Sequence, residues 1–98
     1  MGIIKGNQDN FEELTSKGTV LVDFFATWCG PCKMLAPELE SVSQKITVVE
    51  IDVDENLELS RRFGVMSVPT LILFKDGKEV NVNVGYMPAD EIIKWINQ

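Results

Sequence analysis

The chain has no histidine and only two cysteines, Cys29 and Cys32, among its 98 residues. Without histidine it cannot build a Ser-His-Asp or Cys-His hydrolase, or a zinc site that uses imidazole. Basic residues are also scarce: nine Lys and Arg against fifteen Asp and Glu give a net charge of −6, and such a surface repels nucleic acid. No apolar run approaches the roughly 20 residues that span a bilayer, and the N-terminus lacks the apolar stretch of a secretion signal. These absences predict a cytoplasmic monomer, one domain over residues 1–98, that binds neither nucleic acid nor membrane.

The two cysteines form a single Cys-x-x-Cys pair, for which three uses are conceivable. A structural zinc site needs a second pair, which only a dimer could supply. A structural disulfide would close too small a loop to remove much unfolded-chain entropy, well below the ~3 kcal/mol of a 15-residue loop, and persistent disulfides are rare in the cytosol. The sequence therefore favours the third use, a dithiol that cycles between reduced and oxidised forms.

Hydrophobic periodicity predicts a protein of the α/β class. The predicted helices cover residues 7–17, 32–45, 56–63 and 88–97. The predicted strands cover residues 19–26, 46–53, 70–74 and 80–84, and Ile3 and Ile4 can form one more short strand. Helices between the early strands imply parallel pairing, whereas Asp76-Gly77 predicts a hairpin. The expected sheet is therefore mixed, with helices on both faces.

Two of these elements carry a further local signal. Pro37 lies inside the second predicted helix and should kink it, because proline lacks a donor and crowds the preceding turn. Residues 80–84 alternate valine with asparagine, which is typical of an edge strand with one wet face.

Cys29 is the better placed of the two thiols to act as a nucleophile. It follows a buried strand and leads into a helix, whose free amides and positive dipole end would stabilise a thiolate. Cys32, in the first helical turn, should be the more buried thiol and is positioned to attack the sulfur of Cys29. Between them, Gly30 permits close approach of a partner backbone and Pro31 presets the first turn.

Asp23 places a carboxyl group inside the apolar run of residues 20–26. Burial of a carboxylate costs several kcal/mol unless it is paired, so desolvation should raise the pKa of Asp23. The residue lies on the strand that leads to Cys29, close enough to pass a proton by way of a water. The alternative is an aspartate held by neighbouring hydroxyls or backbone, which serves only strand registry.

Val68-Pro69 immediately precedes the predicted strand at residues 70–74. A cis Pro69 would turn the amide and carbonyl of Val68 outward, free to pair with an extended peptide. Local sequence favours a trans proline that starts a strand, because only about 5–6% of X-Pro bonds are cis.

The run Trp28-Cys29-Gly30-Pro31-Cys32, with Asp23 before it and Val68-Pro69-Thr70 after it, resembles the thioredoxin family over essentially the whole chain. The resemblance implies the thioredoxin fold, a central mixed five-stranded sheet flanked by four helices. It also implies a protein-disulfide reductase that maintains redox homeostasis, with Cys29 as nucleophile and Cys32 as resolving thiol of a redox-active disulfide. Asp23 would assist proton transfer to and from Cys32, and Pro69 would be cis.

The same resemblance implies a surface and partners. The residues that would dock substrate are Trp28, Gly30, Pro31, Val68, Pro69 and Gly85. The partners would be disulfide-containing client proteins and a thioredoxin reductase that uses NADPH. Sulfur exchange of this kind requires no metal or organic cofactor.

The chain departs from the family pattern near the acid and at the rim of the docking surface. A lysine close to the buried acid in some relatives is replaced by an apolar residue, which we assign to Val48. Without that cation, Asp23 should be harder to ionise. Met66, Tyr86 and Met87 should make the rim more apolar, with ordinary loop packing as an equal alternative for Met66.

Two other functions stay open to the sequence. An oxidase or isomerase usually carries a histidine between its cysteines, so Gly30-Pro31 and the missing secretion signal argue against that direction. A redox-indifferent binding module would use the docking surface to hold a partner. Such a module would survive replacement of both cysteines by serine.

Overall fold

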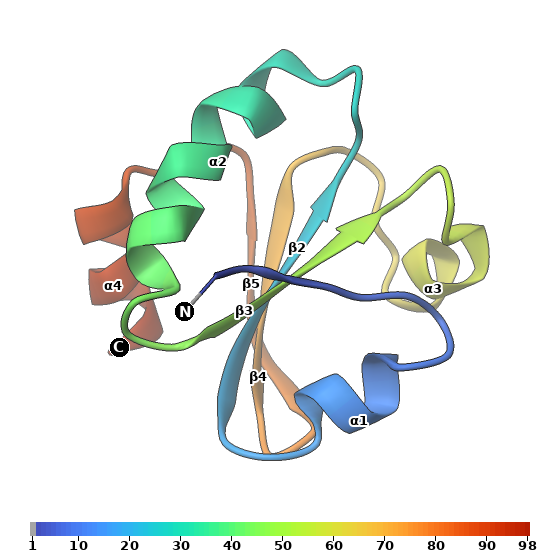
Figure 1. The fold of residues 1–98 in the computed structure, drawn as a ribbon, viewed down its shortest axis with the longest axis horizontal. Coiled ribbons are helices and arrows are strands. Elements are labelled where there is room, and N and C mark those ends of the chain that lie inside the picture. Colours follow the sequence, from blue (N-terminus) through green and yellow to red (C-terminus); the bar gives the residue numbers. More distant parts are fainter. Residues whose placement is uncertain (1) are drawn as a thin grey trace.

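A central sheet with two helices on each side makes up the computed structural model, which describes residues 2–98 (Figure 1). The strands are β1 (Ile4–Lys5), β2 (Thr19–Phe25), β3 (Thr47–Asp52), β4 (Thr70–Lys75) and β5 (Lys78–Val84). The helices are α1 (Phe11–Thr15), α2 (Gly30–Val42), α3 (Leu57–Arg62) and α4 (Ala89–Ile96). The α/β class, the mixed five-stranded sheet and the four helices are confirmed.

The strand order across the sheet is β1-β3-β2-β4-β5. β3 runs parallel to β1 and β2, whereas β4 runs antiparallel to β2 and β5. Asp76 and Gly77 join β4 to β5 with φ angles of 50° and 86°, as a tight hairpin turn requires. Because β2 and β3 are parallel, their carboxyl ends meet at one edge of the sheet, where the cysteine pair lies.

The sheet separates two hydrophobic cores. Under α1 and α3 the core contains four aromatic rings, with contacting centroids 5.3 to 6.0 Å apart: Phe11, Phe24, Phe63 and Phe74. Under α2 and α4 it is aliphatic, and its most buried members include Leu21, Leu35, Leu39, Leu71 and Ile92. Each such side chain contributes roughly 1.5–3 kcal/mol on burial, so both layers hold the sheet in place beneath the disulfide.

Two helices begin two or more residues away from their predicted starts, whereas α3 and α4 begin within one residue of theirs. The first, expected from residue 7, begins at Phe11, because Oδ1 of Asn7 accepts the N–H groups of Asp9 and Asn10 in a local turn. The second begins at Gly30, two residues earlier than expected. Pro37 lies inside this helix, and the kink expected there stays a prediction.

β5 is the edge strand that was expected, but its valines are the exposed residues. Val80, Val82 and Val84 are 52%, 44% and 62% exposed, whereas the asparagines between them are half-buried. Register pairs Val82 with Ile72, on the sheet face that carries α1 and α3. At this edge those helices leave the valines uncovered, so the apolar face of the strand is its wetter one.

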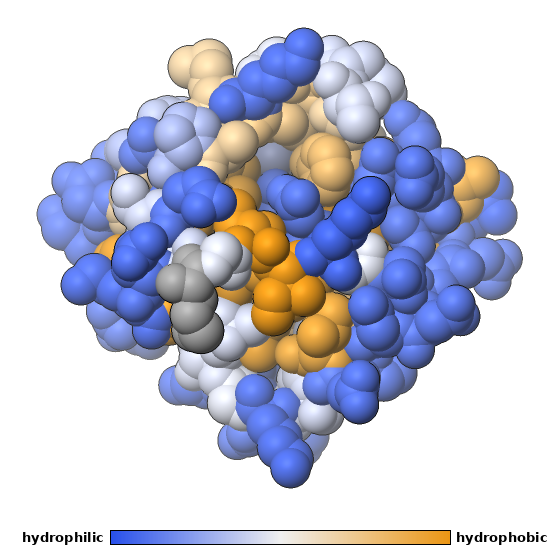
Figure 2. All heavy atoms as spheres, in the orientation of Figure 1, coloured by the Kyte–Doolittle hydropathy of each residue, from blue (hydrophilic) through white to orange (hydrophobic). Residues whose placement is uncertain are grey.

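The opposite edge of the sheet is formed by β1, and both of its residues are exposed. Figure 2 shows apolar residues gathered at the centre of this side of the molecule, over β1 and β3, with hydrophilic side chains around them. Across residues 2–98, none of the helices combines the length and apolar character needed to cross a membrane.

Candidate active site

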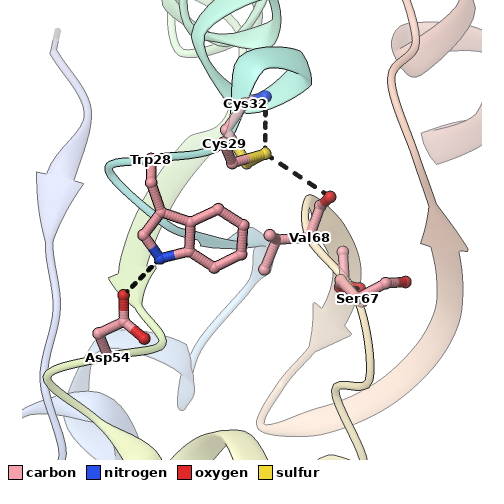
Figure 3. Close-up of a disulfide and its surroundings, with 7 residues drawn as sticks. Trp28, Cys29, Cys32, Asp54, Ser67 and Val68 are labelled. Carbon is pink, nitrogen blue, oxygen red and sulfur yellow. Dashed lines mark hydrogen bonds between the residues drawn. A yellow bond between two sulfur atoms is a disulfide. The ribbon is translucent and has the colours of Figure 1, made fainter.

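Cys29 and Cys32 form a disulfide where β2 ends and α2 begins (Figure 3). Their Cα atoms lie 5.2 Å apart. Cys29 is the N-cap of α2, and the backbone N–H of Cys32 donates a hydrogen bond to its Sγ at 3.1 Å. This donor and the positive end of the helix dipole are placed to stabilise negative charge on Cys29.

Both cysteines are buried, Cys29 at 4% and Cys32 at 7% exposure. The expectation that Cys32 is the more buried residue is therefore wrong in this oxidised form. Cys29 lies beneath the loop before β4, where its Sγ is 3.6 Å from the carbonyl oxygen of Val68. Ala26 packs against both cysteines, and together they form a small apolar cluster next to the main cores.

The Val68–Pro69 peptide bond is cis, as the family resemblance implied and contrary to the expectation from local sequence. Figure 3 shows the Val68 carbonyl directed at the disulfide. Gly85, which follows β5 with φ of 105°, donates its N–H to the Pro69 carbonyl at 2.9 Å. The end of β5 is thereby joined to the proline loop.

Trp28 forms the opposite side of the site. Its side chain is largely solvent-exposed, and its Nε1 donates to Oδ2 of Asp54 at 2.8 Å (Figure 3). A cavity of about 380 Å³ lies between this tryptophan and the proline loop; its lining residues are Trp28, Val53, Val65, Met66, Ser67 and Val68. An apolar hollow therefore lies between two neighbours of Cys29: Trp28, which precedes it in sequence, and Val68, whose carbonyl approaches its sulfur.

The three residues expected at the apolar rim differ in their exposure to solvent. Met66 is 95% exposed at the cavity, so loop packing does not account for it. Tyr86 is exposed as well. Met87 is half-buried and packs against the core beneath α2 and α4, so its place on the rim stays a prediction.

Asp23 is 3% exposed, and its Oδ1 has no hydrogen-bond partner within residues 2–98. Burial, and secondly the charge of Glu50, raise the pKa of Asp23 to about 7. Asp23 lines a second cavity, of about 250 Å³, together with Cys32, Lys33 and Glu50. A carboxyl group that titrates near neutrality beside a thiol is suited to give and accept protons.

The residue beside this acid is Glu50, and the assignment of that position to Val48 is wrong. β2–β3 register pairs Glu50 with Asp23 and Val48 with Leu21. Val48 is buried in the core under α2 and α4. The expected direction for Asp23 is confirmed: its pKa is raised, by burial and by a neighbouring negative charge.

Sequence reasoning missed Asp54 and Glu50. Asp54 follows β3 closely, and the shared edge of two parallel strands brings it to Trp28. Glu50 is the one charged residue between the apolar residues Val48, Val49 and Ile51. For both residues, the sequence signal was a charged side chain within a buried strand or close to its end.

The site places a disulfide at the N-terminus of a helix, with a cis proline against it and a buried carboxyl beneath it. This arrangement is that of a dithiol–disulfide oxidoreductase.

The Thioredoxin family model matches residues 2–98. Thioredoxin of Bacillus subtilis is 47% identical over 102 residues, which cover 100% of this chain and 98% of that protein. Thioredoxin of Chlamydia muridarum is 50% identical over 95 residues, covering 94% of this chain and 93% of that protein. The solved structure of a mutant thioredoxin from Halobacterium salinarum has a TM-score of 0.89 at 41% identity, covering 98% of this chain and 87% of that chain.

The chain therefore belongs to the thioredoxin family. It is a protein-disulfide oxidoreductase, and Cys29 and Cys32 are its redox-active pair for dithiol–disulfide exchange. Membership of this family also implies two kinds of partner, disulfide-containing client proteins and a reductase.

Proposed function

We propose that this protein reduces the disulfides of client proteins as a monomeric, single-domain electron donor, with Cys29 as nucleophile and Cys32 as resolving thiol. The observation that carries the proposal is the bond from the Cys32 N–H to the Cys29 Sγ at the N-terminus of α2. Helix amides and dipole favour the thiolate at the cap position over the position inside the first turn. The Cys29 sulfur is therefore the one activated for attack.

The reaction takes place in two exchange steps. The Cys29 thiolate attacks one sulfur of the client disulfide, and the other client sulfur leaves as a thiolate. Cys32 then loses its proton and attacks the Cys29 Sγ, so that the Cys29–Cys32 bond forms as the bond to the client breaks. The client gains two electrons and the pair becomes oxidised.

Asp23 is proposed to exchange the proton of Cys32. Both residues line the 250 Å³ cavity, and a pKa of about 7 leaves the carboxyl able to accept a proton at neutral pH. Its buried, unpartnered Oδ1 makes a purely registry-fixing role a poor explanation, because a structural carboxyl would be expected to be paired.

A client segment is proposed to dock across the exposed surface around the disulfide. The docking residues are Trp28, Gly30, Pro31, Val68, Pro69 and Gly85. Trp28, Gly30 and Pro31 are exposed, and the Gly85–Pro69 hydrogen bond holds the far side of the surface in place. The 380 Å³ cavity between Trp28 and Met66 fits an apolar client side chain.

The oxidised pair is proposed to be recycled in the cytoplasm by an NADPH-dependent thioredoxin reductase. Support for this partner comes from family membership, because related chains across the whole length carry the name thioredoxin. The Gly30-Pro31 dipeptide between the cysteines, which contains no histidine, favours the reducing direction.

Trapping of the mixed disulfide tests the roles of the two thiols. Cys32→Ser should accumulate a stable adduct between Cys29 and a disulfide-bonded client peptide, detected by mass spectrometry. The reciprocal Cys29→Ser variant should give none, and an adduct on Cys32 would reverse the assignment. Titration of the wild-type couple against defined thiol buffers tests the direction: a value close to the established thioredoxin potential of about −270 mV supports a reductant, and one close to about −120 mV an oxidant.

A further inference from the structure

A row of side chains crosses the sheet from its outer edge to a point beneath the disulfide. Strand register pairs Lys5 of β1 with Glu50 of β3, and Glu50 with Asp23 of β2. Residues paired in this way lie on the same face of a sheet, here the face covered by α2. Lys5 is exposed, Glu50 is half-buried and Asp23 is buried, so the row leads from solvent to the interior.

The inner end of this row opens into the cavity next to the resolving thiol. Asp23, Cys32, Lys33 and Glu50 are among its lining residues, and its volume of about 250 Å³ accommodates several waters. The unpartnered Oδ1 belongs to Asp23, which is only 3% exposed. The half-buried Glu50 reaches from this interior toward solvent.

The charges around the row leave Asp23 without a compensating cation. Leu71 of β4, its register partner on the other side, is apolar. From α2, Lys33 lines the cavity and Glu40 faces Glu50, while β1 contributes Lys5. Within residues 2–98 no ion pair joins Asp23 to a cation. Two neighbouring carboxyl groups therefore share one partly dry space, which disfavours ionisation of both at once.

Burial raises the pKa of both acids, Asp23 and Glu50. The pKa of Glu50 is raised by burial; Lys5 opposes that shift and Glu40 adds to it. Burial and the charge of Glu50 together raise the pKa of Asp23. A proton that leaves Asp23 thus finds an acid of increased proton affinity on the route to solvent.

We propose that Glu50 is a positioning residue of the resolving step. Across the shared cavity, it makes Asp23 a stronger base for the Cys32 proton. It also forms the outer end of the path by which that proton reaches solvent. This rests on the proposed role of Cys32 as resolving thiol. In the step, the Cys32 thiol gives its proton to the Asp23 carboxylate, and its sulfur displaces the client sulfur from Cys29. The proton on Asp23 then leaves by way of cavity water and the Glu50 carboxylate.

The test is the pH profile of the resolving step in Glu50→Gln. The mixed disulfide with a fluorescent peptide is formed in the intact protein and release of the peptide is followed in single turnover. Loss of the Glu50 charge should move the midpoint of the profile about half a pH unit lower and slow the high-pH plateau about twofold, because Asp23 becomes a weaker base. Glu50→Asp, which keeps the carboxylate, should restore most of the midpoint.

Glu79→Gln is the matched control, since it removes the same charge from an exposed position on β5, at the other side of the sheet. Its midpoint should equal that of the wild type. A Glu50→Gln profile that coincides with wild type overturns the inference, even if the variant is less stable to denaturant. Titration of the Asp23 side-chain carbonyl by NMR in the oxidised protein gives an independent reading, and an unchanged Asp23 midpoint in Glu50→Gln also overturns it.

The wild-type protein separates this inference from the proposed function. Failure of the wild type to release peptide at any pH would refute the roles given to Cys29 and Cys32. Normal release with a Glu50-independent midpoint would refute the role of Glu50 alone.

Discussion

Asp23 destabilises the fold at neutral and higher pH, where its ionised carboxylate can accept the proton of Cys32. Folding raises its pKa from 3.8 to about 7, so the native protein holds a proton that the unfolded chain releases. The contribution to stability is complete below about pH 4, and it is lost progressively as the pH rises from there through about 7. The full loss is roughly 3–5 kcal/mol, reached above about pH 8.

Asp23→Asn should therefore stabilise the protein at high pH while it slows turnover. The amide does not ionise, so the variant should resist denaturant better than wild type by a few kcal/mol at about pH 8.5 and by little at about pH 4. Urea unfolding at the two pH values measures the difference. A variant that is less stable than wild type at the higher pH would make Asp23 a structural residue.

Asp54 acts on the site through Trp28. Its carboxylate accepts the indole N–H at 2.8 Å, which fixes the ring along one wall of the 380 Å³ cavity. Asp54→Ala should lower the second-order rate of client reduction a few-fold, whereas Asp54→Asn, which keeps an acceptor oxygen, should lower it less. Stopped-flow kinetics with one client peptide test this. Equal rates for both variants and the wild type would show that the bond does not position the ring.

Most strands and helices could be predicted from hydrophobic patterns, and the exceptions have physical causes. The alternation in β5 shows which residues share a face, but it does not show how far α1 and α3 extend over that face. The first helix does not begin at Asn7, because the Asn7 side chain accepts hydrogen bonds from the N–H groups of Asp9 and Asn10 and so forms a turn there. The exposure of β5 and the start of the first helix therefore depend on contacts that the hydrophobic pattern does not show.

The exposed valines of β5 should tolerate polar substitution. Val82→Thr is expected to change the free energy of unfolding by less than about 0.5 kcal/mol, because the side chain is 44% exposed. Val22→Thr, the same change at a fully buried position of β2, should cost about 1–3 kcal/mol through its buried hydroxyl. Urea denaturation of both variants compares the two positions. Similar losses would mean that β5 is covered in solution.

The active-site residues that follow one another in sequence were easier to predict than those that meet only in the fold. Cys29, Cys32 and Trp28 lie in one motif. Glu50 reaches Asp23 through strand register, whereas comparison with the family pattern had pointed to Val48, two residues away. The orientation of the Val68–Pro69 bond depends on tertiary contacts, so local sequence favoured the wrong isomer.

The whole molecule carries a net charge of −6, which should bias its choice of clients. Basic disulfide peptides should react faster than acidic ones of equal length at low salt, because opposite charges accelerate encounter. The two rates should converge near about 0.5 M salt, where the Debye length is only about 3–5 Å. Rates for a matched peptide pair across a salt series check this. A rate ratio that does not change with salt would place the selectivity in local contacts.

The bond between the Cys32 amide and the Cys29 sulfur has a spectroscopic consequence. This amide proton points at the atom whose charge changes most during the catalytic cycle. Its NMR chemical shift and hydrogen-exchange rate therefore report the oxidation state directly. Fraction oxidised could be followed in a cell lysate from one isotope-labelled residue, with no dye attached to either sulfur.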